Sequence, residues 1–161
     1  MKKSLLFILL LGLPTIMQAQ AEEVEISKVI GRLFTAMAKS DSILLRSVFS
    51  KEVTLASIYR NKEKQQIFSR EYSINDFMES VGKAQPGALA EEIWNLKIEL
   101  DGEFAQAWCE YAFYYQDTFS HCGVDAFHLI KTPDGWKIFH LADTRRKEGC
   151  TIPEEIQSKH K

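Results

Sequence analysis

The sequence is poor in cysteine, glycine and proline, with 3 Cys, 8 Gly and 4 Pro among 161 residues. So few cysteines exclude a disulfide-dense scaffold, and so few glycines exclude a collagen-like chain. No sign of charge dominates, because 20 basic residues stand against 22 acidic ones and the net charge is −2. This balance argues against a broad surface for nucleic acid or an anionic membrane. The 45% hydrophobic content is too high for a disordered chain, so the length predicts one globular domain.

The first residues have the pattern of a targeting segment. Lys2 and Lys3 precede an apolar run over residues 5–13, and Ala19-Gln20-Ala21 offers a small-x-small cleavage site. We therefore predict a secretory signal peptide over residues 1–21. The alternative, an uncleaved anchor helix, needs a longer apolar run to cross about 30 Å of bilayer. The pattern predicts a secreted or periplasmic protein, in a compartment where disulfides persist.

The rest of the chain is predicted to be helical first and then stranded, which is typical of an α+β fold. Apolar spacing predicts a helix over 22–39, a short second helix capped by Ser40 or Asp41, and a third helix from Ser73. Strands are expected at about 53–59, 91–100, 103–116, 120–131 and 135–146, with turns at Asp101-Gly102 and Pro133-Asp134-Gly135. Residues 60–70 are predicted as a loop or an exposed hairpin, and 151–161 as a loose polar tail. A single domain over 22–150 accounts for these elements.

The predicted hairpin registers sort the strands into two faces. The face turned toward the helices collects apolar residues and, among them, a polar cluster of Tyr111, Asp125 and His140. Such a cluster can hold a carbonyl group and move a proton, so these three are the candidate catalytic residues. A hydrogen-bonded network that only positions the sheet is the alternative. The ligand-binding candidates on the same face are Trp94, Phe113, His121 and Phe127.

The opposite face of the last three predicted strands also carries apolar residues. They include Trp108, Val124, Phe139 and Leu141. An apolar exterior of this extent predicts a partner surface, and a two-fold homodimer is the simplest solution. The alternative is that the C-terminal tail folds over this face.

The cysteines divide into two kinds. Cys109 is predicted to point inward and Cys122 outward, whereas Cys150 lies just past the last strand, from which the chain could fold back to Cys122. We predict a disulfide between Cys122 and Cys150. No zinc-ligand spacing, Walker loop or Gly-x-Gly-x-x-Gly motif is present, so we expect no metal and no cofactor.

Several motifs carry a resemblance to a known superfamily. They are Trp108-Cys109-Glu110-Tyr111, then Ser120-His121-Cys122-Gly123-Val124-Asp125-Ala126-Phe127, then Gly135-Trp136-Lys137-Ile138, and Asp143-Thr144-Arg145-Arg146. With the order of elements, they resemble the nuclear transport factor 2-like (cystatin-like) superfamily, in its bacterial SnoaL-like and "putative lumazine-binding" branch. The resemblance covers about 22–148 and implies a cone-shaped, curved antiparallel sheet wrapped around N-terminal helices, with a pocket between them and commonly a dimer.

Three functions are compatible with this sequence. The first is an exported small-molecule-binding domain with an apolar pocket that bears the Tyr–Asp–His cluster. The second is an isomerase, dehydratase or cyclase that uses Asp125 or His140 as its general base. The third is a non-catalytic dimeric interaction domain. Fold alone does not choose among them.

Overall fold

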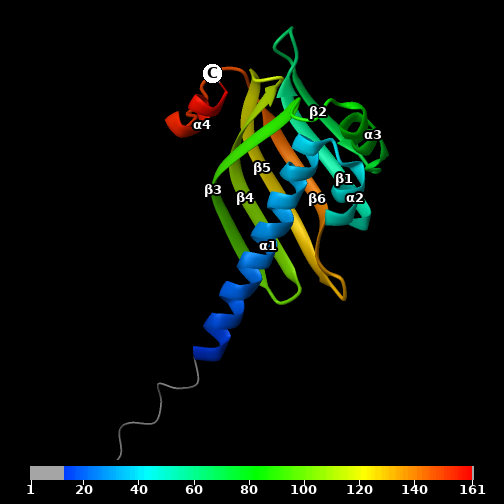
Figure 1. Cartoon of the computed structure of the whole chain (residues 1–161), viewed down its shortest axis with the longest axis vertical. Coiled ribbons are helices and arrows are strands. Elements are labelled where there is room, and N and C mark those ends of the chain that lie inside the picture. The colour runs from blue at the N-terminus through cyan, green and yellow to red at the C-terminus, as the bar shows by residue number, and fades with distance from the viewer. Residues whose placement is uncertain (1–12, 161) are drawn as a thin grey trace, which may run out of the picture.

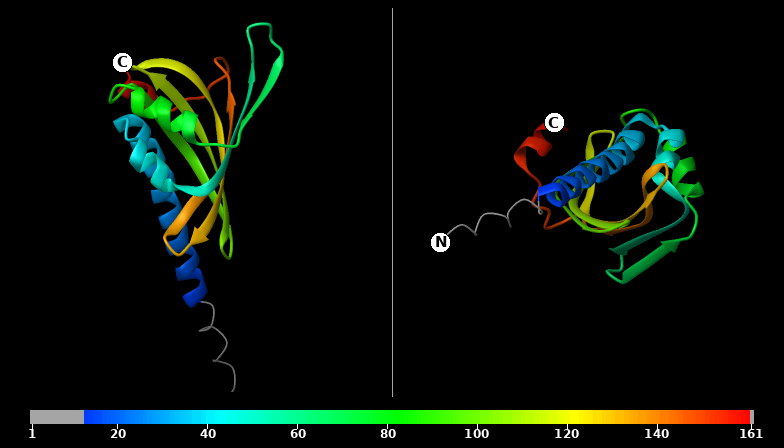
Figure 2. Two further views of the ribbon diagram at one scale, coloured as in Figure 1. Left: turned by 90° about the vertical axis from the view of Figure 1, so that its right-hand side faces the viewer. Right: turned by 90° about the horizontal axis from the view of Figure 1, so that it is seen from below.

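The computed structural model describes residues 13–160, with side chains from residue 18 onward. Its helices and strands follow one another as α1 (Leu13–Lys39), α2 (Ser42–Val48), β1 (Phe49–Arg60), β2 (Gln66–Glu71), α3 (Asn75–Lys83), β3 (Leu89–Asp101), β4 (Phe104–Tyr115), β5 (Thr118–Thr132), β6 (Gly135–Arg145) and α4 (Glu154–Lys159). The predicted α+β architecture is confirmed. Helices α1, α2 and α3 lie on one side of a curved sheet, as Figures 1 and 2 show.

The sheet has six strands in the order β2-β1-β6-β5-β4-β3. Consecutive strands from β3 to β6 pair antiparallel through short turns, whereas β1 pairs parallel with β6. We call the side that carries α1 the inner face and the opposite side the outer face. Seen from below, the sheet bends around α1 (Figure 2). A strongly curved sheet and a helix laid across it leave room between them at one end.

Helix α1 supplies much of the core. Ile26, Ile30 and Leu33 recur at helical spacing and are buried against the inner face. Each such apolar side chain stabilises the fold by about 1.5–3 kcal/mol. Glu22 fixes the helix to the β5–β6 hairpin, because its Oε2 accepts a 2.7 Å hydrogen bond from Trp136 Nε1 and its Oε1 pairs with Lys131.

Local signals explain where α1 stops and α2 begins. Ser40 has a φ of 57°, a left-handed conformation that ends α1. Asp41 then caps α2, since its Oδ1 accepts hydrogen bonds from the backbone N–H groups of Ile43 and Leu44 at 3.1 and 2.8 Å. The sequence prediction of a cap at this point is confirmed.

Several boundaries differ from the prediction. Helix α1 begins at Leu13, inside the predicted signal peptide, and residues 1–12 of that segment lie outside the described residues. For residues 60–70 the structure has the hairpin, one of the two predicted alternatives, in which β2 pairs with β1 and Arg60 lies opposite Gln66. The predicted loose tail contains α4, which docks because Ile156 is buried against Ala112 and Tyr114 on the outer face. The polar composition of this tail gave no sequence signal for the helix, and the His160 ring after it also stacks on Tyr114, with ring centroids 3.8 Å apart.

Bulges in β3 and β6 decide which side chains of these two strands reach the inner face. In β3 the register shifts between Trp94 and Lys97, around Asn95 at a φ of 53°. In β6 the shift lies at Phe139, because His140 pairs with His128 whereas Ile138 pairs with Leu129. An extra residue turns every later side chain to the other face of the sheet. The sequence prediction assumed unbroken alternation and therefore misplaced parts of both strands.

The hairpin registers differ from the predicted ones in a simpler way elsewhere. Counting back from the predicted turns places Ile98 opposite Ala105 and Phe127 opposite Cys109, whereas in the structure Ile98 and Phe127 both pair with Ala107. Both shifts are of two residues, which preserves the face of every side chain concerned. The inner-face assignments for β4 and β5 therefore hold.

The C-terminal segment is fastened to the sheet by the disulfide that the sequence predicted. Cys122 of β5 is bonded to Cys150, with their Cα atoms 6.0 Å apart. The chain reaches this position because Cys122 and Arg146 exchange two backbone hydrogen bonds of 2.9 Å. Cys109 is free and buried. Within residues 13–160, no helix is long and apolar enough to cross a membrane.

The disulfide gives a stability prediction. Cys150→Ser should lower the free energy of unfolding by about 2–4 kcal/mol, because the bond restricts the unfolded chain. Urea unfolding followed by fluorescence measures the change. Dithiothreitol should lower the stability of the wild-type protein by a similar amount and leave Cys150→Ser unaffected. Equal stability of the variant and the oxidised wild type would contradict this role.

Candidate functional site

A cavity of about 280 Å³ lies between the inner face and helices α1 and α3. Most of its wall is apolar and comes from both helices and from strands β3, β4 and β6; the apolar lining residues are Leu33, Phe34, Met37, Phe77, Val81, Leu89, Phe113 and Leu141. Ligand pockets of proteins occupy roughly 300–1,000 Å³ and are mostly apolar with a few placed polar groups. This cavity fits the small end of that class.

Apart from Ser80 of α3, the polar groups of the cavity come from the four strands of the meander. They are Glu91 of β3, Tyr111 of β4, His121 and Asp125 of β5, and Asp143 and Arg145 of β6. The sequence analysis predicted Tyr111, His121, Asp125 and the apolar Phe113 for this place, and the structure brings these four together. Glu91, Asp143 and Arg145 are not among the residues that the sequence predicted for the cavity. The bulges in β3 and β6 turn them inward.

Three predicted residues lie elsewhere. His140 is on the outer face, where its ring lies 5.4 Å from that of His128 and its Nδ1 is 2.6 Å from Thr54 Oγ1, so its predicted place in the cavity was wrong. Because of the bulge in β3, Trp94 faces outward and packs beside Tyr114 and Ile156. Phe127 points inward but is fully buried against Phe34, with ring centroids 6.4 Å apart, and does not line the cavity.

A signal for the β6 bulge is present in the sequence. Trp136 and Ile138 alternate on the inner face, and the next inward apolar residue is Leu141, three positions further on. An odd spacing between two inward residues requires an extra residue in the strand. Asn95, a residue type that tolerates positive φ, is a weaker signal for the bulge in β3.

Glu91 and Asp125 form the most unusual feature of the cavity. Asp125 is only 3% exposed. Its side chain lines the same cavity as that of Glu91, and each carboxyl group shifts the pKa of the other. Two carboxyl groups can share a hydrogen bond only if one of them carries a proton.

Burial is the main cause of the raised pKa values in this pair. It raises the pKa of Glu91 to about 7, and the charge of Asp143 adds to the effect. The pKa of Asp125 is raised well above its usual range by burial and then by the charge of Glu91. The pair therefore holds at least one proton around neutral pH, next to an apolar wall.

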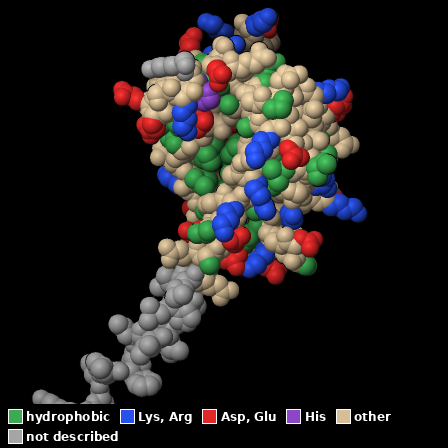
Figure 3. Space-filling view, viewed as in Figure 1, with side chains coloured by type: hydrophobic (Ala, Val, Ile, Leu, Met, Phe, Trp, Pro, Cys, Tyr) green, Lys and Arg blue, Asp and Glu red, His purple; other side chains and the backbone are tan. Residues whose placement is uncertain are grey.

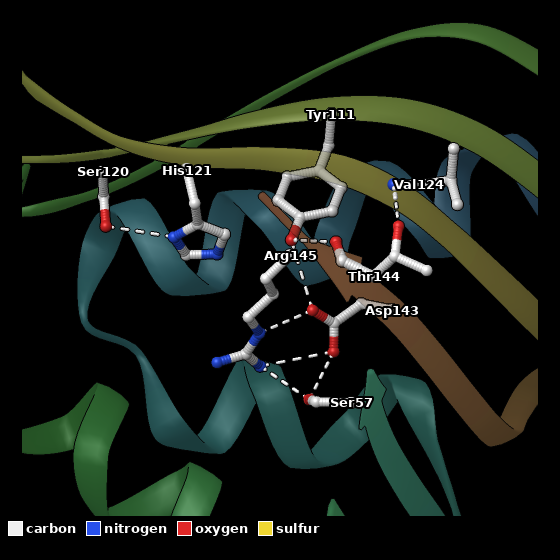
Figure 4. A network of polar contacts seen from close by, with 8 residues as sticks. All are labelled: Ser57, Tyr111, Ser120, His121, Val124, Asp143, Thr144 and Arg145. Carbon is white, nitrogen blue, oxygen red and sulfur yellow. Dashed lines mark hydrogen bonds and ion pairs between the residues drawn. The ribbon is translucent and has the colours of Figure 1, made fainter. Parts of the chain in front are cut away.

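Tyr111 is held in place by its hydroxyl group and by a close backbone. Its Oη donates a 2.9 Å hydrogen bond to the carbonyl oxygen of Thr144 and lies 3.2 Å from Asp143 Oδ2 (Figure 4). Burial raises the pKa of the phenol, which stays protonated. Gly123 pairs with Tyr111 across the sheet, and a Cβ at Gly123 would stand 1.7 Å from the Thr144 carbonyl oxygen. Only glycine fits beneath the tyrosine ring.

Asp143 and Arg145 form an ion pair at one side of the cavity. Arg145 Nε donates to Asp143 Oδ2 at 2.6 Å, and Arg145 Nη2 donates to Ser57 Oγ at 2.8 Å (Figure 4). Asp143 is largely buried whereas Arg145 is half exposed. A second cavity of about 220 Å³, toward β1 and α3, shares both residues and Ser80 with the first.

His121 completes the polar lining. Its ring lies between those of Tyr111 and Phe113, with centroids 5.7 and 5.2 Å away, and its Nδ1 is 3.0 Å from Ser120 Oγ (Figure 4). Burial, followed by the charge of Arg145, lowers the pKa of His121 to about 4. The imidazole is therefore neutral at physiological pH and can donate or accept one hydrogen bond at each nitrogen, according to its tautomer. Among residues 13–160, no group of three or more His, Cys, Asp or Glu side chains could hold a metal ion.

Fold and site define the class of this protein: a curved six-stranded sheet that bends over helices, with a mostly apolar cavity between them, is the nuclear transport factor 2-like, cystatin-like fold. Within that superfamily, the chain belongs to the family described as "Putative lumazine-binding", whose sequence model matches residues 21–140. The resemblance noted from the sequence motifs is confirmed. No curated protein is similar enough to count as a match.

Solved structures agree on the fold. A nuclear transport factor 2-like protein with a cystatin-like fold from Novosphingobium aromaticivorans superimposes with a TM-score of 0.63 at 14% identity, covering 88% of this chain and 92% of that one. A nuclear transport factor 2-like superfamily protein from Salmonella enterica gives 0.62 at 17% identity, covering 83% and 96%. A "putative dehydratase" of this family from Streptomyces avermitilis gives 0.62 at 11% identity, covering 80% and 99%.

The carboxyl pair predicts a pH-dependent stability. The pKa of Glu91 rises from 4.5 to about 7 on folding, so the stability that its proton confers is complete below pH 4.5 and is lost as the pH rises to about 7. Glu91→Gln should remove this loss, which is on the order of 2 kcal/mol. Urea unfolding at pH 5 and pH 7.5 measures the difference.

A control separates this effect from that of His121. The lowered pKa of His121 works in the opposite direction, because its contribution is lost as the pH falls from 6.5 toward 4. This contribution is common to the wild type and to Glu91→Gln, and the comparison of the two removes it. Glu23→Gln, on the exposed side of α1, should keep the wild-type pH dependence. An unchanged dependence in Glu91→Gln would show that Glu91 does not hold a proton.

Proposed function

We propose that this protein is an exported small-molecule-binding domain whose cavity encloses a compact, ring-containing ligand. The observation that carries the proposal is the cavity itself, with apolar walls from α1, α3 and the sheet and with its polar groups gathered on the strands. Apolar walls favour burial of a ring, and a few fixed polar groups orient it. The family description, "Putative lumazine-binding", names a ligand of this flat, ring-containing kind.

A test needs a variant that closes the cavity without disturbing the core. Ser80 is exposed and lines both cavities, so Ser80→Trp should block their junction. Native mass spectrometry of protein purified from its own host should show a retained small molecule in the wild type and at least about a tenfold lower occupancy in Ser80→Trp, equivalent to about 1.4 kcal/mol of binding.

His140→Ala is the matched control, since His140 lies on the outer face. It should retain the ligand as the wild type does. An empty wild-type cavity, or equal occupancy in Ser80→Trp, would contradict the proposal.

An acid–base enzyme is the second candidate. Its support is the Glu91–Asp125 pair, because one carboxyl group can accept a proton while the other donates one. Of the two general bases expected from the sequence, Asp125 lies in the cavity and His140 does not. An isomerase, dehydratase or cyclase would convert the retained molecule, and Asp125→Asn would abolish the conversion while the fold persists. A binding domain would release the molecule unchanged.

Export is part of the proposal. Its support is the predicted signal peptide over residues 1–21 and the Cys122–Cys150 disulfide, which persists outside the reducing cytoplasm. Residues 18–21 are exposed, and the first fully buried side chain along α1 is Ile26. Cleavage after Ala21 would therefore remove no described core residue.

A homodimer through the outer face remains the proposed assembly. Trp108, Phe104 and Ile130 are 50%, 42% and 43% exposed on this face, and α4 covers only the part around Tyr114. Val124 and Phe139 lie on the same face as predicted, but Leu141 turns inward to line the cavity, because it follows the bulge in β6. A non-catalytic interaction domain would use this face alone.

Trp108→Asp should shift the protein to a monomer, because a charge placed at the centre of an apolar interface is buried without a partner. Sedimentation velocity at several concentrations gives the oligomeric state. Lys28→Asp, on the exposed side of α1, is the charge control and should remain dimeric. A wild type that is monomeric throughout would contradict the assembly.

A further inference from the structure

The linings of the two neighbouring cavities, which share several residues, contain more acidic than basic side chains. Their described lining includes five carboxyl groups and one guanidinium group: Glu71, Asp76, Glu91, Asp125, Asp143 and Arg145. Asp143 and Arg145 neutralise each other at 2.6 Å. No other Arg and no Lys lines either cavity among residues 13–160. Four carboxyl groups therefore face the cavities without a basic partner in the lining. On the face shown in Figure 3, by contrast, acidic and basic side chains are interspersed.

A second observation points to a missing donor. Asp125 Oδ2 is buried, and no hydrogen-bond donor among the described residues reaches it. A buried carboxylate oxygen without a donor destabilises the folded protein, the more so when it is charged. In the free protein, only the proton that Asp125 and Glu91 share can reduce this cost.

We propose that the cavity takes a ligand with a protonated nitrogen, whose N–H group points at Asp125 and Glu91 while its ring lies against the apolar wall. This inference rests on the proposed binding function and names the chemical class of the ligand. A cationic N–H group meets both needs at once, since it supplies the missing donor and balances the excess of carboxyl groups. Hydrogen bonds between charged groups are roughly twice as strong as those between neutral ones.

The rest of the lining supports the same class. Glu71 and Asp76 border the second cavity and are exposed, so they extend the acidic surface toward solvent and attract a cation. Phe113 and Phe34 offer ring faces and edges to the apolar part of the ligand. An anionic ligand would meet the carboxyl pair at the buried end and is disfavoured.

Binding of a cation should depend on pH because it displaces the shared proton. The ionisable groups around the pair are Cys109 and Tyr111 of β4, His121 of β5, and Asp143 and Arg145 of β6. Helices α1 and α3 present only apolar residues and Ser80 to the first cavity, and Asp76 of α3 borders the second. Cys109 and Tyr111 have raised pKa values and stay neutral, so Glu91, with a pKa of about 7, sets the dependence. Affinity for a cation should rise from pH 5.5 to pH 8.

The experiment compares matched probes on the full-length mature protein. Each compact aromatic amine, such as tryptamine, is paired with a neutral compound of equal size, such as 3-propylindole, and with an acid, such as indole-3-acetate. Isothermal titration calorimetry at pH 8 should give about tenfold tighter binding of the amine than of its neutral partner, equivalent to about 1.4 kcal/mol. Alkylamines with a pKa near that of lysine, about 10.4, stay protonated over this range.

Two variants and a control test the residues. Glu91→Gln and Asp125→Asn should each reduce the preference for the amine to about twofold or less and abolish its pH dependence. Glu23→Gln on α1 should keep both. Either carboxyl variant suffices if the other fails to fold.

The outcomes separate this inference from the proposed function. Neutral or acidic probes that bind as tightly as the amines would overturn the inference and leave the binding function intact. If no member of the panel binds at millimolar concentration, both are overturned. Release of a proton on amine binding, seen as a dependence of the heat on the buffer, would support the displacement step.

Discussion

The alternation of side chains along a strand, and its interruption at two bulges, determines the chemistry of this protein. A side chain two positions along a strand returns to the same face, so one inserted residue exchanges the faces for the rest of the strand. Because of the bulge at Asn95, Glu91 faces the cavity and Trp94 lies on the outer face. Because of the bulge at Phe139, Asp143 faces the cavity and His140 lies on the outer face. Without these two irregularities, Asp125 would have no carboxyl partner.

Once Glu91 and Asp125 face the cavity, the surrounding groups are arranged to keep them in place. Tyr111 closes over Gly123 and is tied to the Thr144 carbonyl oxygen, so β4, β5 and β6 are held together beside the pair. Arg145 donates hydrogen bonds to Asp143 and Ser57 and forms no ion pair with Asp125. The cavity thus contains two carboxyl groups that only a proton or a ligand can pair with. Protonation of these groups is therefore linked to binding of a ligand in the cavity.

The sequence was sufficient for the elements and for part of the site. Helical periodicity, the Asp41 cap and the two glycine-containing turns predicted the order of helices and strands, and the motifs around Asp125 identified the superfamily. Tyr111, Phe113, His121 and Asp125 were placed on the correct face because β4 and most of β5 alternate regularly. Glu91 and Arg145 were missed because a bulge is a local backbone event, which one extra residue encodes only weakly. The helix α4 was missed because its segment is polar in composition and carries one buried apolar residue, Ile156, while the other contacts come from Lys159 and His160.

The central claim is that Glu91 and Asp125 share a proton at neutral pH inside an apolar cavity. The direct measurement is NMR titration of the side-chain carboxyl carbons in protein labelled with carbon-13. Our account predicts that Asp125 deprotonates only well above its usual pH range and that Glu91 titrates near pH 7. Titration of both groups near pH 4, as for carboxyl groups in water, would contradict it.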